Sequence, residues 1–313
     1  MSSPRKDCAF SLLELLVAMA VFAMLGLLTV SVISATNQST SLSNRGIDAA
    51  SQARLAFDRI AIDLRGVLKR NDVIFQSTNI SVGTAGDILR CVSLVASAGV
   101  PAADNRNLSV VAYQVGTHAG NSDRLCLLRG AKAIRWNDSG FFGLQSNGLP
   151  LPVLPAAFSP VYPADYDVLA AGVIRMVVGF QLYPDNLPVT LADGSSLAAS
   201  RGQLVYSPPI RTLQPTDGGL PVSSTDISRI CAIIVGLVTV DLNALRSATA
   251  AQMNDLASAY PVPENNTLPL QAWSAISNDV AASSLSVPLP IRQAQRVFER
   301  AFPVTPFGTK EAE

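Results

Sequence analysis

The chain of 313 residues has little of what enzymes use for catalysis or metal binding. It has one histidine, His118, and four cysteines that show neither a C-x-x-C pair nor the Cys/His spacing of a zinc site. Neither a G-x-S-x-G nucleophile motif nor a phosphate-binding glycine loop occurs. The sequence therefore predicts a protein that is not an enzyme and that holds no cofactor or metal.

Charge is also scarce. Charged residues make up 15% of the chain, and 23 basic side chains balance 23 acidic ones. The basic residues are scattered and are not interleaved with aromatic residues, which argues against a nucleic-acid partner. The 20 prolines and 20 glycines indicate many turns, so we expect a loop-rich globular part.

The sequence does contain one long apolar run, from Phe10 to Ala35, in which Glu14 is the only ionisable side chain. About 20 apolar residues in a helix cross a hydrocarbon layer of ~30 Å, and no proline interrupts this run. Arg5 and Lys6 precede it, and basic residues favour the cytoplasmic side. We therefore expect a single membrane span with its amino terminus in the cytoplasm and the rest of the chain on the far side.

The start of this run has a specific order of residues: a short polar, basic leader, then Ala9, Phe10, three residues and Glu14. This order resembles the processing site of type IV prepilins and pseudopilins. The resemblance implies that a prepilin peptidase cuts between Ala9 and Phe10 and that the new amine of Phe10 is methylated. It also implies that Glu14 pairs with such an amine during assembly with homologous subunits. Ala9 departs from the family, which usually has glycine there.

Two alternatives explain the apolar run without this resemblance. A conventional secretory signal would be cut near Ala35. The apolar core of such signals spans only about 7–15 residues, which is shorter than this run, and a charged residue such as Glu14 is unfavourable inside it. A generic membrane anchor explains the length of the run but not the offset between Phe10 and Glu14.

A second helix is expected over residues 37–70, and its start, Asn37 to Asn44, is rich in Ser and Thr, which allows fraying there. Its apolar residues recur at spacings of 4, 3, 4 and 3, which makes one face that should pack on a sheet. These residues are Ala53, Phe57, Ile60, Leu64 and Val67. The pairs expected on the outside of this helix, four residues apart, are Arg54 with Asp58 and Arg59 with Asp63.

Residues 71–242 predict a head made mostly of strands. The strongest strand signals are at 172–183 and 227–242, and the second reads as a central strand covered on both faces. Cys91 and Cys126 both lie in apparent strands, so a disulfide between them is one alternative and two free thiols the other. Cys231 lies in an apolar run and is expected to be a buried free thiol.

Residues 243–313 predict a helical, proline-rich extension. Asp241 or Asn243 can cap a helix that runs to Tyr260, and a second amphipathic helix is expected from Leu270 to Ser283. A short element is expected from Ile291 to Phe302.

The predicted fold is therefore α+β and pilin-like, with a long N-terminal transmembrane helix, an antiparallel β-sheet head and a C-terminal helical extension. The expected parts are a leader at 1–9, a membrane and filament-core helix at 10–36, and then 37–70, 71–242 and 243–313. The segments 172–183 and 227–242 resemble the paired strands of minor pseudopilin J and related minor pilins, and the extension is closer to the prepilin-like proteins of Verru_Chthon cassettes.

These resemblances imply a structural minor subunit of a type IV pilus or a type II secretion pseudopilus, held in the bacterial inner membrane with its head in the periplasm. The alternative is a membrane-anchored binding or adhesion head that uses the prepilin-type leader only for delivery.

Overall fold

The computed structural model describes most of the chain after residue 11. The described ranges are 12–68, 75–79, 88–94, 108–118, 121–134, 142–144, 150–152, 166–184, 188–191, 193–197, 202–213, 222–225, 227–282 and 287–304. The chain divides into two compact units, Met1–Ile47 and Asp48–Glu313. Ala9 and Phe10 lie outside the described residues, as does the leader.

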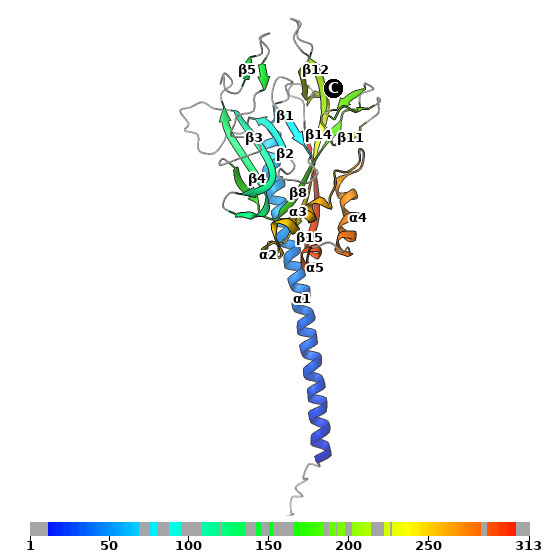
Figure 1. Cartoon of the computed structure of the whole chain (residues 1–313). Coiled ribbons are helices and arrows are strands. Elements are labelled where there is room, and N and C mark those ends of the chain that lie inside the picture. Colours follow the sequence, from blue (N-terminus) through cyan, green and yellow to red (C-terminus); the bar gives the residue numbers. More distant parts are fainter. Residues whose placement is uncertain are drawn as a thin grey trace, which may run out of the picture. The chain divides into compact units, whose positions relative to one another are not determined.

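One helix, α1 (Leu12–Arg65), provides all of the described structure of the first unit and begins the second (Figure 1). The Ser/Thr-rich stretch from Asn37 to Asn44 allows fraying, but the helix is unbroken there. Threonine hydroxyls donate to carbonyls four residues earlier, as Thr36 does to Val32 and Thr40 to Thr36, at 2.8 and 2.9 Å. Such local bonds satisfy the hydroxyls without breaking the backbone ladder.

The second unit contains a five-stranded antiparallel sheet in the order β1-β2-β3-β4-β7. Its strands are β1 (Phe75–Thr78), β2 (Ile88–Ser93), β3 (Leu108–His118), β4 (Asn121–Ile134) and β7 (Tyr166–Ala170). The two long strands β3 and β4 pair from Leu108 opposite Ile134 to His118 opposite Asn121.

A four-stranded antiparallel sheet has the order β11-β8-β14-β15. Its strands are β8 (Val173–Leu182), β11 (Leu204–Val205), β14 (Ile230–Val240) and β15 (Gln295–Pro303), and the 3-10 helix η3 (Ile227–Arg229) precedes β14. The central position predicted for β14 is confirmed, because β8 and β15 flank it along its length.

Two smaller antiparallel sheets contain the remaining described strands. One has the order β10-β9-β12-β13, and the other joins β5 and β6. Their strands are β5 (Phe142–Leu144), β6 (Pro150–Pro152), β9 (Val189–Leu191), β10 (Ser196–Leu197), β12 (Pro209–Leu213) and β13 (Val222–Thr225).

The apolar stripe of α1 enters the first of two hydrophobic clusters. All five stripe residues predicted from the spacing are buried, and they pack with residues of both large sheets. The rings of Phe57 and Phe302 lie 6.2 Å apart, which ties α1 to the end of β15. The side chains of β14 alternate across the sheet: Ile233 and Val235 join this cluster, while Ile234 and Val238 join the second.

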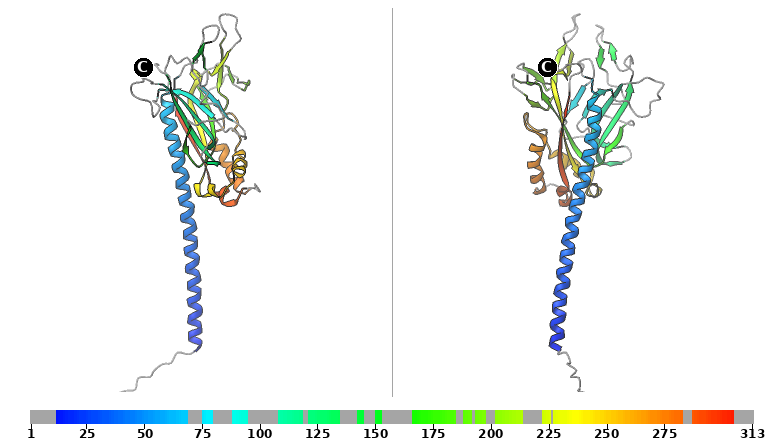
Figure 2. Two further views of the ribbon diagram at one scale, coloured as in Figure 1. Left: turned by 60° about the vertical axis from the view of Figure 1, so that its left-hand side comes forward. Right: turned by 180° about the vertical axis from the view of Figure 1, so that it is seen from behind.

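Short helices from the C-terminal part build the second cluster on the other face of the β8–β14 sheet (Figure 2). They are α2 (Leu242–Arg246), α3 (Ala250–Ser258), α4 (Pro269–Ala282) and α5 (Leu289–Gln293). Trp273 of α4 is fully buried, and its indole N–H donates to the carbonyl of Pro261 at 2.8 Å. The extension is thus part of the core of the second unit.

Two details of the extension differ from the prediction. The helix expected up to Tyr260 is two helices, because Asp241 caps α2 and Thr249 begins α3 with a reciprocal capping box to Gln252. The last element is mainly the strand β15, which adds to the edge of β14 from Ala232 opposite Pro303 to Val240 opposite Gln295.

Candidate functional site

The first part of α1 exposes apolar side chains on every side. From Leu12 to Ile33 every large hydrophobic side chain is at least half exposed, and Leu12 is 84% exposed. Among the described residues, one helix segment, Leu12–Asn37, is long and apolar enough to cross a membrane by length and composition. Its 26 residues span about 39 Å at 1.5 Å per residue, which exceeds a hydrocarbon layer of ~30 Å.

Glu14 lies in the first turn of α1, where the partial positive charge of the helix terminus favours a carboxylate. Its side chain is exposed, and it is the only charged side chain of α1 before Arg45. Because Ala9 and Phe10 are outside the described residues, the predicted cleavage point and its amine have no described geometry. Glu14 itself is placed four residues after Phe10 by the sequence.

A buried ion pair holds the last turns of α1 against the five-stranded sheet. Asp63 is fully buried and accepts two hydrogen bonds from the guanidinium of Arg129 on β4, at 2.7 and 3.1 Å. The hydroxyl of Tyr113 on β3 also donates to this carboxylate. Arg59 lies 3.5 Å from it, and the hydroxyl of Ser93 donates to the backbone carbonyl of Asp63 at 2.7 Å.

Electrostatics keep the Tyr113 hydroxyl and the Arg129 guanidinium protonated. Burial raises the pKa of Tyr113, and the charge of Asp63 and its hydrogen bond raise the pKa further, so the hydroxyl stays a donor. Burial lowers the pKa of Arg129, but its hydrogen bond and ion pair with Asp63 outweigh this effect and raise the pKa overall. A bidentate pair of this kind fixes both distance and orientation.

The prediction that Asp63 pairs with Arg59 on the outside of the helix is wrong in its location. Asp63 is completely buried, because it continues the buried line Ala56, Ile60, Asp63 and Val67 at spacings of 4, 3 and 4. The position of Asp63 on the apolar face of the helix is a sequence signal for a buried carboxylate, and the pairing predicted from the four-residue spacing did not use it. The other pair is confirmed: Arg54 and Asp58 lie 3.8 Å apart and are exposed.

The described structure does not contain the disulfide considered for Cys91 and Cys126, since both are free thiols. Cys91 lies opposite Val111 and Cys126 opposite Gly116, so β3 stands between β2 and β4. Two strand spacings of about 4.8 Å put the residues beyond the ~7 Å Cα separation that a disulfide tolerates. Burial raises the pKa of Cys91 to about 12 and that of Cys126 to about 11. Cys231 is also a free thiol, but it is half-buried and not fully buried as expected.

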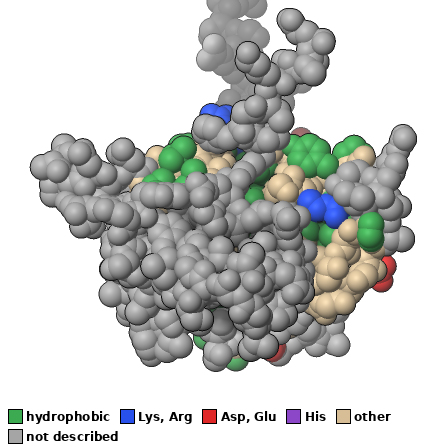
Figure 3. Space-filling view, turned by 90° about the horizontal axis from the view of Figure 1, so that it is seen from above, with side chains coloured by type: hydrophobic (Ala, Val, Ile, Leu, Met, Phe, Trp, Pro, Cys, Tyr) green, Lys and Arg blue, Asp and Glu red, His purple; other side chains and the backbone are tan. Residues whose placement is uncertain are grey.

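Within the described ranges, no group of three or more His, Cys, Asp or Glu side chains is placed to hold a metal ion. His118 is the last residue of β3. On the face shown in Figure 3, the described side chains are mostly apolar or uncharged, and the charged ones are scattered.

Comparison with known proteins identifies the amino-terminal segment. Residues 4–30 match the family model described as the prokaryotic N-terminal methylation motif. No curated protein matches the chain. Among solved structures, a type IV-like pilin from Thermus thermophilus is similar at 13% identity, over 81% of this chain and 93% of that chain, with a TM-score of 0.29.

The matched segment contains Ala9, Phe10 and Glu14 and most of the apolar run. The family resemblance inferred from the order of these residues is confirmed. This chain therefore begins with a prepilin-type segment, a methylation motif that continues into a long apolar helix.

Proposed function

We propose that the chain is a structural subunit of the minor pilin or pseudopilin kind, which assembles with homologous subunits into a type IV pilus or a type II secretion pseudopilus. A prepilin peptidase cuts it between Ala9 and Phe10 and methylates the new amine. The observation that carries the proposal is the methylation motif at 4–30, joined to a helix whose apolar side chains are exposed all round.

Exposed apolar side chains at this density require a non-aqueous environment. Fifteen large hydrophobic side chains between Leu12 and Ile33 are exposed, and burying each is worth at least about 1.5 kcal/mol. Their combined transfer out of water is worth roughly 20 kcal/mol, well beyond the stability of an ordinary domain. Bacterial inner-membrane lipid supplies this environment before assembly, and neighbouring subunits supply it afterwards, with the head in the periplasm.

In this proposal, Glu14 is the residue through which the apolar helix pairs with a neighbouring subunit. The comparable acid, aspartate, costs about 2.5–3.5 kcal/mol at the centre of a membrane span, and a cationic partner lowers such a cost. After cleavage, the ammonium of Phe10 is that partner, either in the same chain or in a neighbour. A charge pair in a medium of low dielectric constant favours one axial register between helices and penalises others.

The test has two parts, both on the full chain expressed with its prepilin peptidase. Mass spectrometry of the membrane-extracted protein should show an N-terminal methyl-Phe10, whereas an N-terminus at Met1 or near Thr36 would contradict the proposal. Cross-linking to homologous subunits should then fall at least several-fold in Glu14→Gln, with cleavage unchanged. Asp48→Asn, an exposed carboxylate on the same helix beyond the apolar run, is the matched control and should cross-link normally.

A membrane-anchored binding head is the second candidate, and a cavity in the second unit favours it. Filament isolation separates the two functions. Presence of the chain in the filament or at its tip supports the subunit, and a free membrane pool supports the anchored head.

A further inference from the structure

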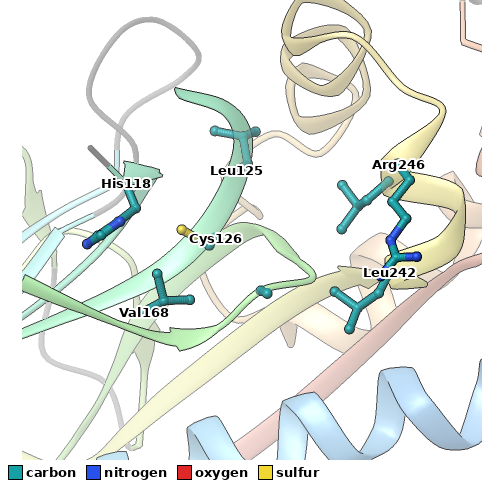
Figure 4. A pocket seen from close by; sticks show the side chains of 8 residues that line it. His118, Leu125, Cys126, Val168, Leu242 and Arg246 are labelled. Carbon is teal, nitrogen blue, oxygen red and sulfur yellow. The ribbon is translucent and has the colours of Figure 1, made fainter. Parts of the chain in front are cut away.

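A cavity of about 220 Å³ opens in the second unit between β4, β7 and α2 (Figure 4). Figure 4 shows Leu242 and Arg246 on α2 across the cavity from Leu125 and Cys126 on β4. Segments far apart in the sequence thus form it together. The residues that line it are His118, Leu125, Cys126, Val168, Ala171, Leu242, Leu245 and Arg246.

The walls are mostly aliphatic. Leu245 is buried, Leu125 and Leu242 are half-buried, and Val168 is 44% exposed although it is a large apolar side chain. Cys126 adds no charge, because burial raises the pKa of its thiol to about 11 and the thiol donates to the carbonyl of Gly116 at 3.3 Å. The walls therefore favour an apolar group.

Two basic side chains line the cavity, and Figure 4 shows them on opposite sides of it: Arg246 on α2 and His118 at the end of β3. Arg246 carries a fixed charge, and its side chain is exposed and makes no ion pair or hydrogen bond with another described residue. His118 adds an imidazole from the end of β3. None of the eight lining residues is acidic, so the charge of Arg246 is not balanced within the cavity.

We propose that this cavity binds a small amphipathic carboxylate, whose aliphatic tail lies against Leu125, Val168 and Leu245 and whose carboxylate pairs with Arg246. The cavity of about 220 Å³ is well above the volume that one water molecule needs, so it has room for a short aliphatic chain such as that of hexanoate. This ligand site goes beyond the role of a filament subunit and does not depend on it.

Two parts of the site make different contributions to binding. The aliphatic wall supplies affinity in proportion to the apolar area covered, and it does not distinguish a carboxylate from an alcohol. Arg246 supplies the distinction, because a charge-assisted hydrogen bond to a carboxylate is about twice as strong as a neutral one. Salt should weaken carboxylate binding, since Arg246 is at the surface, and leave alcohol binding nearly unchanged.

The experiment uses the full chain in lipid nanodiscs with ¹³C-labelled Leu and Val methyl groups, titrated with hexanoate and, separately, with hexanol. The methyl resonances of the lining residues respond to a ligand inside the cavity. Probe molecules that partition into the lipid do not shift these resonances. Hexanoate should shift the methyl resonances of Leu125, Val168, Leu242 and Leu245 saturably, and hexanol should bind at least three-fold more weakly.

Arg246→Gln should reduce hexanoate binding to the level of hexanol, while Arg65→Gln, an exposed arginine that does not line the cavity, should change nothing. Ala171→Leu fills the cavity and should abolish binding of both probes. The proposal is overturned by the absence of saturable shifts, by equal affinity for the two probes in the unaltered chain, or by hexanoate binding that survives Arg246→Gln.

Discussion

Replacing Asp63 with asparagine tests the buried ion pair that fastens α1 to the five-stranded sheet. The substitution keeps the size of the side chain but leaves Arg129, whose side chain is only 15% exposed, without its counter-charge. Removing one partner of a buried pair typically costs about 3–5 kcal/mol. Asparagine still accepts a hydrogen bond, so we expect about 3 kcal/mol, or roughly a hundred-fold change in the ratio of folded to unfolded protein.

Asp58→Asn is the matched control on the same helix. Asp58 pairs with Arg300 at 2.8 Å, but its side chain is 54% exposed and water screens the pair. We expect this variant to lose less than about 1 kcal/mol. A double variant, Asp63→Asn with Arg129→Gln, should be less destabilised than the sum of the two single variants by about 1–3 kcal/mol, because the residues act through each other.

Urea unfolding of the full chain in detergent measures all of these changes, followed by tryptophan fluorescence because Trp273 is fully buried. In a separate thermal melt followed by the same fluorescence, the melting temperature of Asp63→Asn should fall by about 6–12 °C for a domain of this size. Equal losses in Asp63→Asn and Asp58→Asn would refute the argument, and so would strict additivity in the double variant.

Three further predictions follow from other parts of the chain. Gly236→Ala should lower the free energy of unfolding by about 1–3 kcal/mol, because its new Cβ would lie 2.5 Å from Cβ of Pro269. Gly46→Ala should raise it by about 0.5–1 kcal/mol, because Gly46 lies in a helix with open space around it, and urea unfolding measures both changes. Folded protein at pH 8 should leave Cys91 unalkylated by iodoacetamide in peptide mapping, since a pKa near 12 leaves about one thiol in 10⁴ ionised; rapid labelling would contradict its burial. Deletion of residues through about Ala35 should give a monomeric, folded domain by size-exclusion chromatography and circular dichroism, and aggregation would instead indicate that the stripe of α1 faces a partner.

Burial of Cys91 should also make the stability of the fold fall at alkaline pH. Its pKa is raised from 9.0 to about 12 in the folded chain, so the folded state keeps a proton that the unfolded state loses. The contribution of Cys91 to the free energy of unfolding is therefore complete below about pH 9 and is lost as the pH rises toward 12. Burial raises the pKa of Tyr113 in the same direction.

The sequence by itself determined the features that depend on local composition and spacing. The apolar run and the offset of Glu14 identify the prepilin-type segment, because membrane insertion and processing read a contiguous stretch. The spacing of the stripe from Ala53 to Val67 predicts the buried face of the helix, because a helix buries residues at a fixed period. The long apolar run of β14 likewise predicts its central place in the sheet.

Only the tertiary structure decided which distant residues meet. Asp63 finds Arg129 inside the fold, β3 separates Cys91 from Cys126, and β15 extends the sheet beside β14. The cavity near Arg246 likewise depends on how α2 lies against β4 and β7. Strand order is set by long-range pairing and not by the period of any one segment, so no local pattern in the sequence contains it.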